Sequence, residues 1–329
     1  MAEDKRMSPE ELTAYHEKQL ELANDKIERG LKNLATPELY KLFLEQLGKL
    51  KGFTLNNSIL IHEQMSSATK LETYNDWNEK YELQVNQKSK VRVIKYTPYT
   101  KEIDKEVVDP RTNQILRDGE GNAITKKELI TIPNFKTEAL FDISQTKGDR
   151  ALIPEQAGVE NMGLLIKSIE GTLGEPLVIK PRANKQTALK EAVQVLTTRQ
   201  LDKKEELFVR DESGMNHRIP KTDVVKAFEQ ESVLYATCQH FGIQAGAEQL
   251  LALAKQVDAS DVNLFKGVLE SVHFTTMSNI RVIDASFKEQ TQELPQKKSI
   301  MSKLSQNKDK ISQPEHGEST PTKSKAMGL

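Results

Sequence analysis

The chain has 329 residues, with 47 Lys and Arg against 48 Asp and Glu and a formal net charge of −1 at pH 7. This balance excludes a protein that is basic over its whole surface, but it allows a local basic face. The single cysteine, Cys238, excludes internal disulfides and cysteine-only zinc sites. No signal peptide is visible, and no apolar run approaches the ~20 residues of a membrane helix. We therefore expect a cytoplasmic protein without a membrane partner.

Three helices are predicted at the start of the chain. A capping-box pattern at Ser8 and Glu11 begins a helix over residues 8–34. A Thr-Pro pair begins a second helix at Thr36, with apolar residues at helical spacing behind it. A third helix is predicted over residues 57–65.

The pattern then changes to strands separated by clusters of turn residues. Strands are predicted over residues 91–99, 106–108, 128–132 and 134–143. A helical start followed by an antiparallel sheet predicts an α+β fold.

The second half of the chain is predicted to be mostly helical and zincin-like. Helices are predicted over residues 162–169, 186–200, 221–241, 245–257 and 261–277, and strands over residues 176–180 and 206–210. From about residue 287 the chain is rich in Lys, Ser and Gln and poor in aromatics, which predicts disorder. The expected organisation is a domain over residues 8–150, a second over residues 158–285 and a disordered tail over residues 286–329.

The stretch from Phe53 to Tyr99 combines cations with aromatic side chains. Between Asn86 and Lys101 it contains five Lys and Arg residues and no acid. Phosphates attract Lys and Arg, and unpaired bases stack on flat rings, so this composition suits a single nucleic-acid strand. Alternation of Lys and Arg with Val and Ile is equally consistent with a solvated face of a sheet.

A set of ten residues is the candidate nucleic-acid site. They are Phe53, Asn56, Asn57, Trp77, Lys88, Lys90, Arg92, Lys95, Tyr96 and Tyr99. The four cations are expected to neutralise phosphates and the four rings to stack bases, which gives little sequence preference. A lone tryptophan is more often a core residue, however, and the two asparagines are equally consistent with helix capping.

Four segments of the first half carry a resemblance to a known family. They are Phe-x-x-Asn-Asn-x-x-Leu-Ile over residues 53–61, Thr-Tyr-Asn-Asp-Trp over residues 73–77, Pro-Asn-Phe-Lys over residues 133–136 and Phe-Asp-Ile-Ser-Gln-Thr over residues 141–146. On these segments, residues 8–147 resemble the N-terminal domain of ArdC-type antirestriction proteins, and more closely the LtrC-type proteins of conjugative elements. The resemblance implies a mobile-element or phage protein that binds single-stranded DNA and protects transferred DNA.

The second half resembles the zinc-peptidase-like domain of the full-length relatives. That domain binds zinc through His-Glu-x-x-His on one helix and an acidic ligand on a later helix. Residues 229–243 resemble the later helix and would place Glu229 or Glu231 at the acidic ligand. The stretch that resembles the first helix, from about Ala188 to Thr197, has no histidine, and no two of the six histidines of the chain are four residues apart. We therefore expect a degenerate domain, a pseudoenzyme without metal, cofactor or catalytic residues.

Two other functions remain open on the sequence. One is a zinc metallopeptidase with unrecognised ligands. The other is an interaction or anti-defence module whose C-terminal domain docks a host or transfer protein. Because RNA also presents phosphates and stackable bases, it remains a candidate partner beside DNA.

Overall fold

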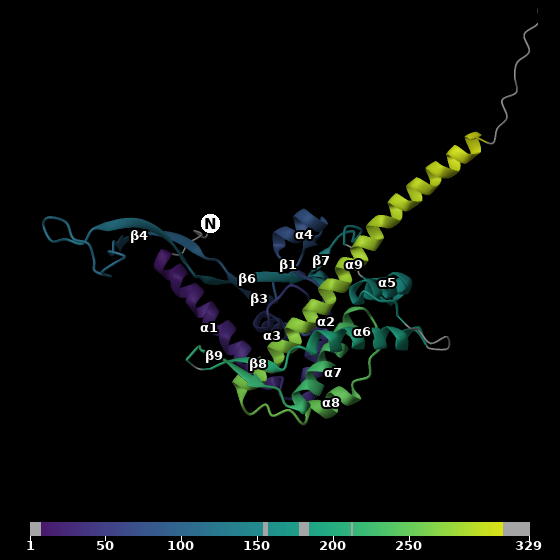
Figure 1. Cartoon of the computed structure of the whole chain (residues 1–329), viewed down its shortest axis with the longest axis horizontal. Helices are drawn as coiled ribbons and strands as arrows, with labels where there is room; N and C mark the ends of the chain where they lie inside the picture. The colour runs from purple at the N-terminus through teal and green to yellow at the C-terminus, as the bar shows by residue number, and fades with distance from the viewer. Residues whose placement is uncertain (1–7, 154–156, 178–183, 212, 312–329) are drawn as a thin grey trace, which may run out of the picture.

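The computed structural model describes residues 8–153, 157–177, 184–211 and 213–311 (Figure 1). Its helices are α1 (Pro9–Asn33), α2 (Pro37–Lys49), α3 (Leu55–Gln64), α4 (Tyr74–Tyr81), α5 (Met162–Leu173), α6 (Lys185–Leu201), α7 (Asp223–His240), α8 (Glu248–Ala254) and α9 (Val262–Ile311). Its strands are β1 (Leu71–Glu72), β2 (Gln84–Val85), β3 (Val91–Tyr96), β4 (Tyr99–Glu106), β5 (Thr125–Ile132), β6 (Phe135–Asp142), β7 (Thr146–Lys147), β8 (Glu206–Arg210) and β9 (Asn216–Pro220).

The predicted α+β class is confirmed, and the first helices begin where their capping residues lie. Ser8 Oγ accepts a hydrogen bond from the Glu11 N–H at 3.1 Å, and Glu11 Oε2 accepts one from the Ser8 N–H at 2.8 Å. Pro37 occupies the first turn of α2. The short helix α4 and the strand β9 were not predicted. In the described part of the chain, no helix is long and apolar enough to cross a membrane.

The central sheet is antiparallel, with strand order β1-β6-β3. β3 pairs with β6 along the whole length of β3, from Val91 opposite Leu140 to Tyr96 opposite Phe135. The single strand predicted over residues 91–99 is therefore two strands, because β4 begins a separate hairpin at Tyr99. Pro98, which lacks an N–H group, lies in the break.

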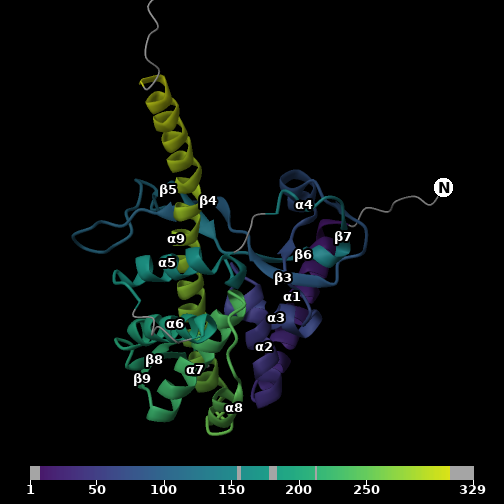
Figure 2. The ribbon, with the colours of Figure 1, turned by 90° about the vertical axis from the view of Figure 1, so that its right-hand side faces the viewer.

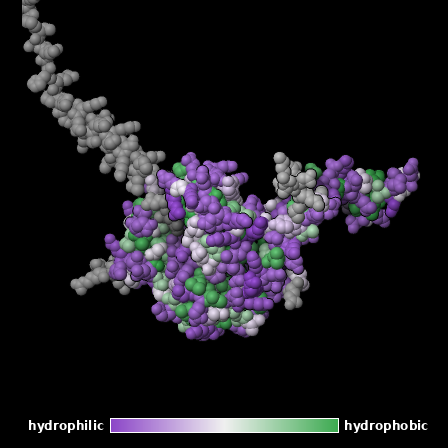
Figure 3. Space-filling model, turned by 180° about the vertical axis from the view of Figure 1, so that it is seen from behind, coloured by the Kyte–Doolittle hydropathy of each residue, from purple (hydrophilic) through white to green (hydrophobic). Residues whose placement is uncertain are grey.

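The hairpin of β4 and β5, called the arm below, projects from the body of the molecule (Figure 1). Residues 99–132 contain six Lys and Arg against seven Asp and Glu. Hydrophobic side chains lie among the hydrophilic ones on the arm (Figure 3), and Leu129 is 72% exposed. The arm therefore lacks the excess of positive charge that a phosphate-binding surface needs.

Helix α3 lies along the free edge of β3. The Asn57 side-chain amide donates to the Ile94 carbonyl and accepts from the Ile94 N–H, both at 2.9 Å. Gln64 makes the same two bonds with Arg92, at 2.8 and 3.1 Å. These amides satisfy edge groups that would otherwise be open to another strand. The pairing also shows that α3 and β3 run in opposite directions.

The largest hydrophobic core crosses the predicted domain boundary. It joins side chains of α1, α2 and α3 to those of β8, α7, α8 and α9. Tyr40 of α2 stacks on Phe228 of α7 with 5.0 Å between ring centroids, and the Tyr235 hydroxyl donates to Glu45 at 2.9 Å. The regions before and after this predicted boundary thus share one hydrophobic core.

Gly48 marks the closest approach of α2 to α7. A Cβ atom at Gly48 would lie 2.6 Å from the Ala236 carbonyl oxygen and 2.9 Å from Gln239 Cβ. We expect Gly48→Ala to lower the free energy of unfolding by about 1–3 kcal/mol, because backbone would have to move. Denaturant unfolding checks this, with Gly163→Ala in α5 as the control, since a Cβ there meets nothing within 4 Å. Equal stabilities for the two variants would contradict the close packing.

The C-terminal helix α9 is much longer than predicted. We predicted its end at residue 277, but it continues as one helix of 50 residues to Ile311. Figure 2 shows its C-terminal part extending away from the other elements. Residues 286–311 of the predicted tail thus belong to α9, in keeping with the helix propensity of their Lys, Gln, Glu and Met residues. The rest of the predicted tail, and residues 178–180 of the predicted strand at 176–180, lie outside the described residues.

Candidate nucleic-acid interface

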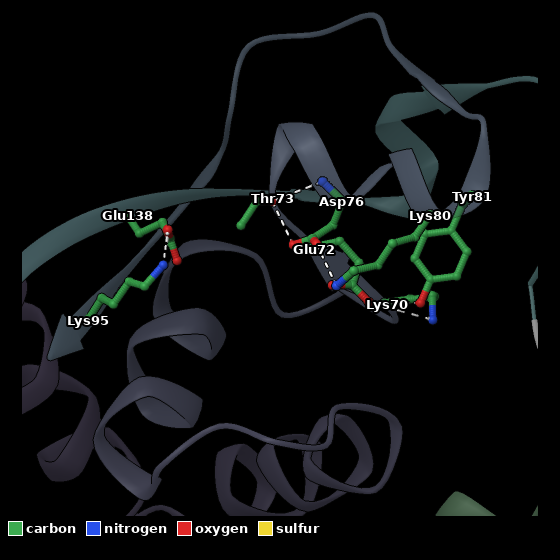
Figure 4. Close-up of polar contacts among 8 residues, drawn as sticks. All are labelled: Lys70, Glu72, Thr73, Asp76, Lys80, Tyr81, Lys95 and Glu138. Atoms are coloured by element: carbon green, nitrogen blue, oxygen red, sulfur yellow. Dashed lines mark hydrogen bonds and ion pairs between the residues drawn. The ribbon is translucent and has the colours of Figure 1, made fainter. Parts of the chain in front are cut away.

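The four predicted phosphate-binding cations Lys88, Lys90, Arg92 and Lys95, called the basic strip, are all exposed at or before β3. Side chains alternate along a strand, so Arg92 and Lys95 point to opposite faces of the sheet. Lys95 Nζ lies 2.6 Å from Glu138 Oε1 (Figure 4). The other three cations form no ion pair with any residue that the structure describes. The basic strip is therefore accessible, but it is not a single flat face.

An exposed pair of rings lies at the end of the sheet. Tyr96 and Phe135, called the aromatic pair below, are register partners with ring centroids 5.2 Å apart. Their exposed fractions are 54% and 47%. Tyr99, at the start of the arm, is 51% exposed. Large rings this exposed have faces available for a base.

The neighbouring register pair is Lys95 opposite Lys136. Like charges directly opposite each other in an antiparallel pair are unfavourable unless an anion compensates them. Glu138 partly compensates Lys95, whereas Lys136 is exposed and forms no ion pair within the described residues. Two register pairs in succession thus place two cations on one face of the sheet and two rings on the other face, at the same end of the sheet.

Phe135 and Lys136 were not among the predicted site residues. Both lie in the Pro-Asn-Phe-Lys segment that contributed to the family resemblance, and this was the available signal. Their role as neighbours of Lys95 and Tyr96 depends on the register of β3 on β6. Register between strands about 40 residues apart in the chain is set by tertiary packing, so a local pattern could not supply it.

The prediction that Trp77 stacks a base is wrong. Its side chain is fully buried, and its Nε1 donates a hydrogen bond to the Phe141 carbonyl at 2.8 Å. The ring packs against Tyr81 with 5.2 Å between centroids. Trp77 is a core residue that fixes α4 to β6, so no face of its ring is open to a base.

The two asparagines have different roles. Asn57 uses both groups of its side-chain amide on the backbone of β3, as described above, so it contributes to the fold. The N-cap of α3 is Thr54, whose hydroxyl accepts from the Asn57 N–H at 3.3 Å. Asn56 is exposed, and with Phe53 it lines a cavity beside α9.

Cations on and just before α4 are paired with acids, as Figure 4 shows. Lys80 lies 2.5 Å from Asp76, and this contact lowers the pKa of the Asp76 carboxyl. Lys70 lies 4.6 Å from the Tyr81 ring centroid and 3.8 Å from Glu72. This side of the sheet therefore offers little free positive charge, in contrast to Lys136 and most of the basic strip.

The carboxylate predicted at the acidic-ligand position is paired with a lysine. Glu229 Oε2 lies 2.6 Å from Lys221 Nζ, and both side chains are almost fully buried. Burial raises the pKa of Glu229, and the Lys221 ammonium acts against this shift. Burial raises the pKa of Glu231 as well. Among the described residues, no three His, Cys, Asp or Glu side chains are grouped so that they could hold a metal ion.

Comparison with known proteins gives a distant structural likeness. No family model matches the chain, and no curated protein matches it. The chain is similar to two crystal structures of the antirestriction protein ArdC from plasmid R388, one metal-free and one Mn(II)-bound. Each ArdC chain is 12% identical to this chain, and the TM-scores are 0.36 and 0.35. The matches cover 72% of this chain and 86% and 85% of the ArdC chains. At these values the likeness says nothing about individual site residues.

Proposed function

We propose that this protein binds single-stranded DNA without sequence specificity, through the end of the sheet formed by β3 and β6. The observation that carries the proposal is the succession of two register pairs, Lys95 opposite Lys136 and Tyr96 opposite Phe135. The cations attract phosphates, and the rings stack bases exposed in a single strand. In duplex DNA the bases are already stacked, so the aromatic pair favours a single strand.

The remaining cations extend this surface along β3. Arg92 and Tyr96 lie on the same face of the sheet, because side chains alternate along a strand and these two residues are an even number of positions apart. Lys88 and Lys90 precede the strand and are exposed. Half-buried Ile94, which packs against α1, lies between Arg92 and Tyr96, so the bound strand passes around this contact rather than over a flat sheet.

The resemblance of residues 8–147 to ArdC-type proteins supports a biological setting for this activity. In that setting the protein covers DNA strands during transfer of a mobile element and protects them from nucleases, including restriction enzymes. Neither stacking nor phosphate contact reads the edges of bases. Weak sequence preference would suit a protein that must cover any transferred strand.

Salt dependence tests the electrostatic part of the proposal. Five phosphate contacts, by the basic strip and Lys136, predict a slope of log affinity against log salt near −3.5, from about −0.7 per contact. We expect Arg92→Gln/Lys95→Gln/Lys136→Gln to make this slope shallower by about 2. Fluorescence anisotropy of a labelled oligothymidylate over a salt series measures both slopes.

The matched control is Lys167→Gln/Lys255→Gln/Lys266→Gln, which removes the same charge from α5, the end of α8 and α9. This variant should keep the wild-type slope. Equal slopes for all three proteins, or equal affinity for single-stranded and duplex DNA, would contradict the proposed surface. The same series with an RNA strand shows whether the protein prefers DNA.

A further inference from the structure

A cavity of about 900 Å³ lies between the start of α3 and one face of α9. Residues 51–56 form one wall, and side chains between residues 270 and 288 form the other. This volume is within the usual range for pockets that hold a small organic ligand. Phe53 and Asn56, two of the predicted nucleic-acid-binding residues, both line it.

The cavity has the groups that bind a phosphate. Leu55 and Asn56 belong to the first turn of α3, where backbone N–H groups have no intrahelical acceptor. Arg281 and Lys288 are two helical turns apart on α9, line the same cavity, and are exposed. Neither forms an ion pair with another described residue. Their charges are thus available to an anion.

Lys51 also lines the cavity, but its charge is already used. Its Nζ lies 2.6 Å from Asp284 Oδ2; burial acts to raise the pKa of the Asp284 carboxyl, but the contacts with His240 and Lys51 outweigh it and lower this pKa. The Asp284 carboxylate also lies 3.6 Å from His240 Nε2. The free positive charge of the cavity therefore comes from Arg281 and Lys288 of α9.

The same cavity has an apolar wall and one unpaired polar atom. Phe53, Phe274 and Met277 supply the apolar surface that a base needs. His273 hydrogen-bonds the backbone of Phe53, and burial lowers the pKa of its imidazole to about 4, so the ring is neutral at pH 7. Its Nε2 is buried without a hydrogen-bond partner among the described residues. A buried polar atom of this kind favours a ligand that can bond it.

The cavity lies at the same end of α3 as the proposed strand-binding surface. Asn57, near the start of α3, bonds Ile94, whereas Gln64, at its end, bonds Arg92. β3 therefore continues from Ile94 to Tyr96 in the direction of the first turn of α3. A strand on the aromatic pair could thus extend toward this cavity.

We propose that the cavity between α3 and α9 is a nucleotide pocket, which holds a base against Phe53 and Met277 and a phosphate between the start of α3 and the side chains of Arg281 and Lys288. The occupant of the pocket is one nucleotide of the bound strand, and this identification of the occupant rests on the proposed function. The pocket itself is defined by its own residues and can be tested with a free nucleotide.

Binding of thymidine monophosphate, measured by isothermal titration calorimetry on the full chain, tests the pocket. We expect Arg281→Gln/Lys288→Gln to weaken binding at least about tenfold, because each substitution removes a charge-assisted contact. Ala285→Trp, at an exposed position of the lining, should abolish binding by filling the cavity. Lys255→Gln/Lys266→Gln is the charge-matched control and should bind as the wild type does.

Unchanged affinity of both pocket variants for thymidine monophosphate would overturn the proposal. The proposal would also be overturned if the wild-type protein binds oligothymidylate but does not bind thymidine monophosphate. The aromatic-pair variant Tyr96→Ala/Phe135→Ala separates the two proposals, because it should bind the oligonucleotide about 30-fold more weakly and bind the mononucleotide as the wild type does. The wild-type protein could instead bind the mononucleotide, in a way that depends on Arg281 and Lys288, and bind no oligonucleotide. That result would support the pocket and refute the strand-binding function.

Discussion

Replacing Tyr96 and Phe135 together by alanine is expected to weaken binding of an oligothymidylate about 30-fold or more. Each base stacked on an aromatic ring contributes about 1–3 kcal/mol by alanine substitution, so the loss of two rings costs at least about 2 kcal/mol. The two rings contact each other at one end of the sheet, and about half of each side chain is exposed. Their removal should therefore change the fold little.

Fluorescence anisotropy at low salt measures this loss, and circular dichroism verifies that the variant is folded. Tyr74→Ala is the matched control, because Tyr74 is also 54% exposed but lies on α4, near cations that are paired with acids. The control should bind as the wild type does. If both proteins lose the same affinity, general surface hydrophobicity and not the aromatic pair explains binding. If neither loses any, the strand does not stack at this end of the sheet.

Local signals in the sequence were sufficient for much of the fold. The capping box of Ser8 and Glu11 is an interaction within one turn, and Pro37 has a fixed φ that suits the first turn of α2, so these residues themselves specify the two helix starts. The alternation of β3 and β6 likewise predicts strands. The full length of α9 was missed because Lys-, Ser- and Gln-rich segments have the composition of disordered chains, although several of these residues also have good helix propensity.

The site was predictable only in part, since its geometry depends on long-range pairing. Composition found the basic strip and Tyr96, but it could not show that Glu138 pairs with Lys95. It also suggested Trp77, whose burial depends on contacts with β6. Phe135 and Lys136 become site residues only once β6 is placed beside β3. Sequence pattern thus identifies one strand of a two-strand site.

The pairing of Glu229 with Lys221 leads to the second large effect. Lys221→Met should lower the free energy of unfolding by about 3–5 kcal/mol, because it leaves a buried carboxylate without its cation. Lys221→Met/Glu229→Leu should recover most of this loss, since neither charge of the buried pair remains. Denaturant unfolding of both variants measures the difference. Lys226→Met is the control, because Lys226 makes an exposed ion pair with Glu205 and should change the unfolding midpoint little.

The pH dependence of the Lys221→Met variant sharpens this test. Burial raises the pKa of Glu229 already in the presence of Lys221. Without that ammonium, the pKa in the folded state rises further above its unfolded value. The unfolded chain then releases the proton first, so the stability deficit is small below the unfolded pKa and grows as pH rises toward the folded pKa. A deficit that is constant with pH would point to lost packing of the lysine chain instead of an uncompensated charge.

The outcome also bears on metal chemistry in the second half of the chain. A carboxylate that must be deprotonated to bind a metal is here held by an ammonium in the core. If the double variant is as stable as the wild type and Lys221→Met is not, the pair is a self-contained structural unit. The opposite result has two parts: the purified wild-type protein contains stoichiometric zinc, and Lys221→Met is no less stable than the wild type. Together they would show that Glu229 is available as a ligand. The two results exclude each other, since Lys221→Met cannot be both less stable than the wild type and no less stable.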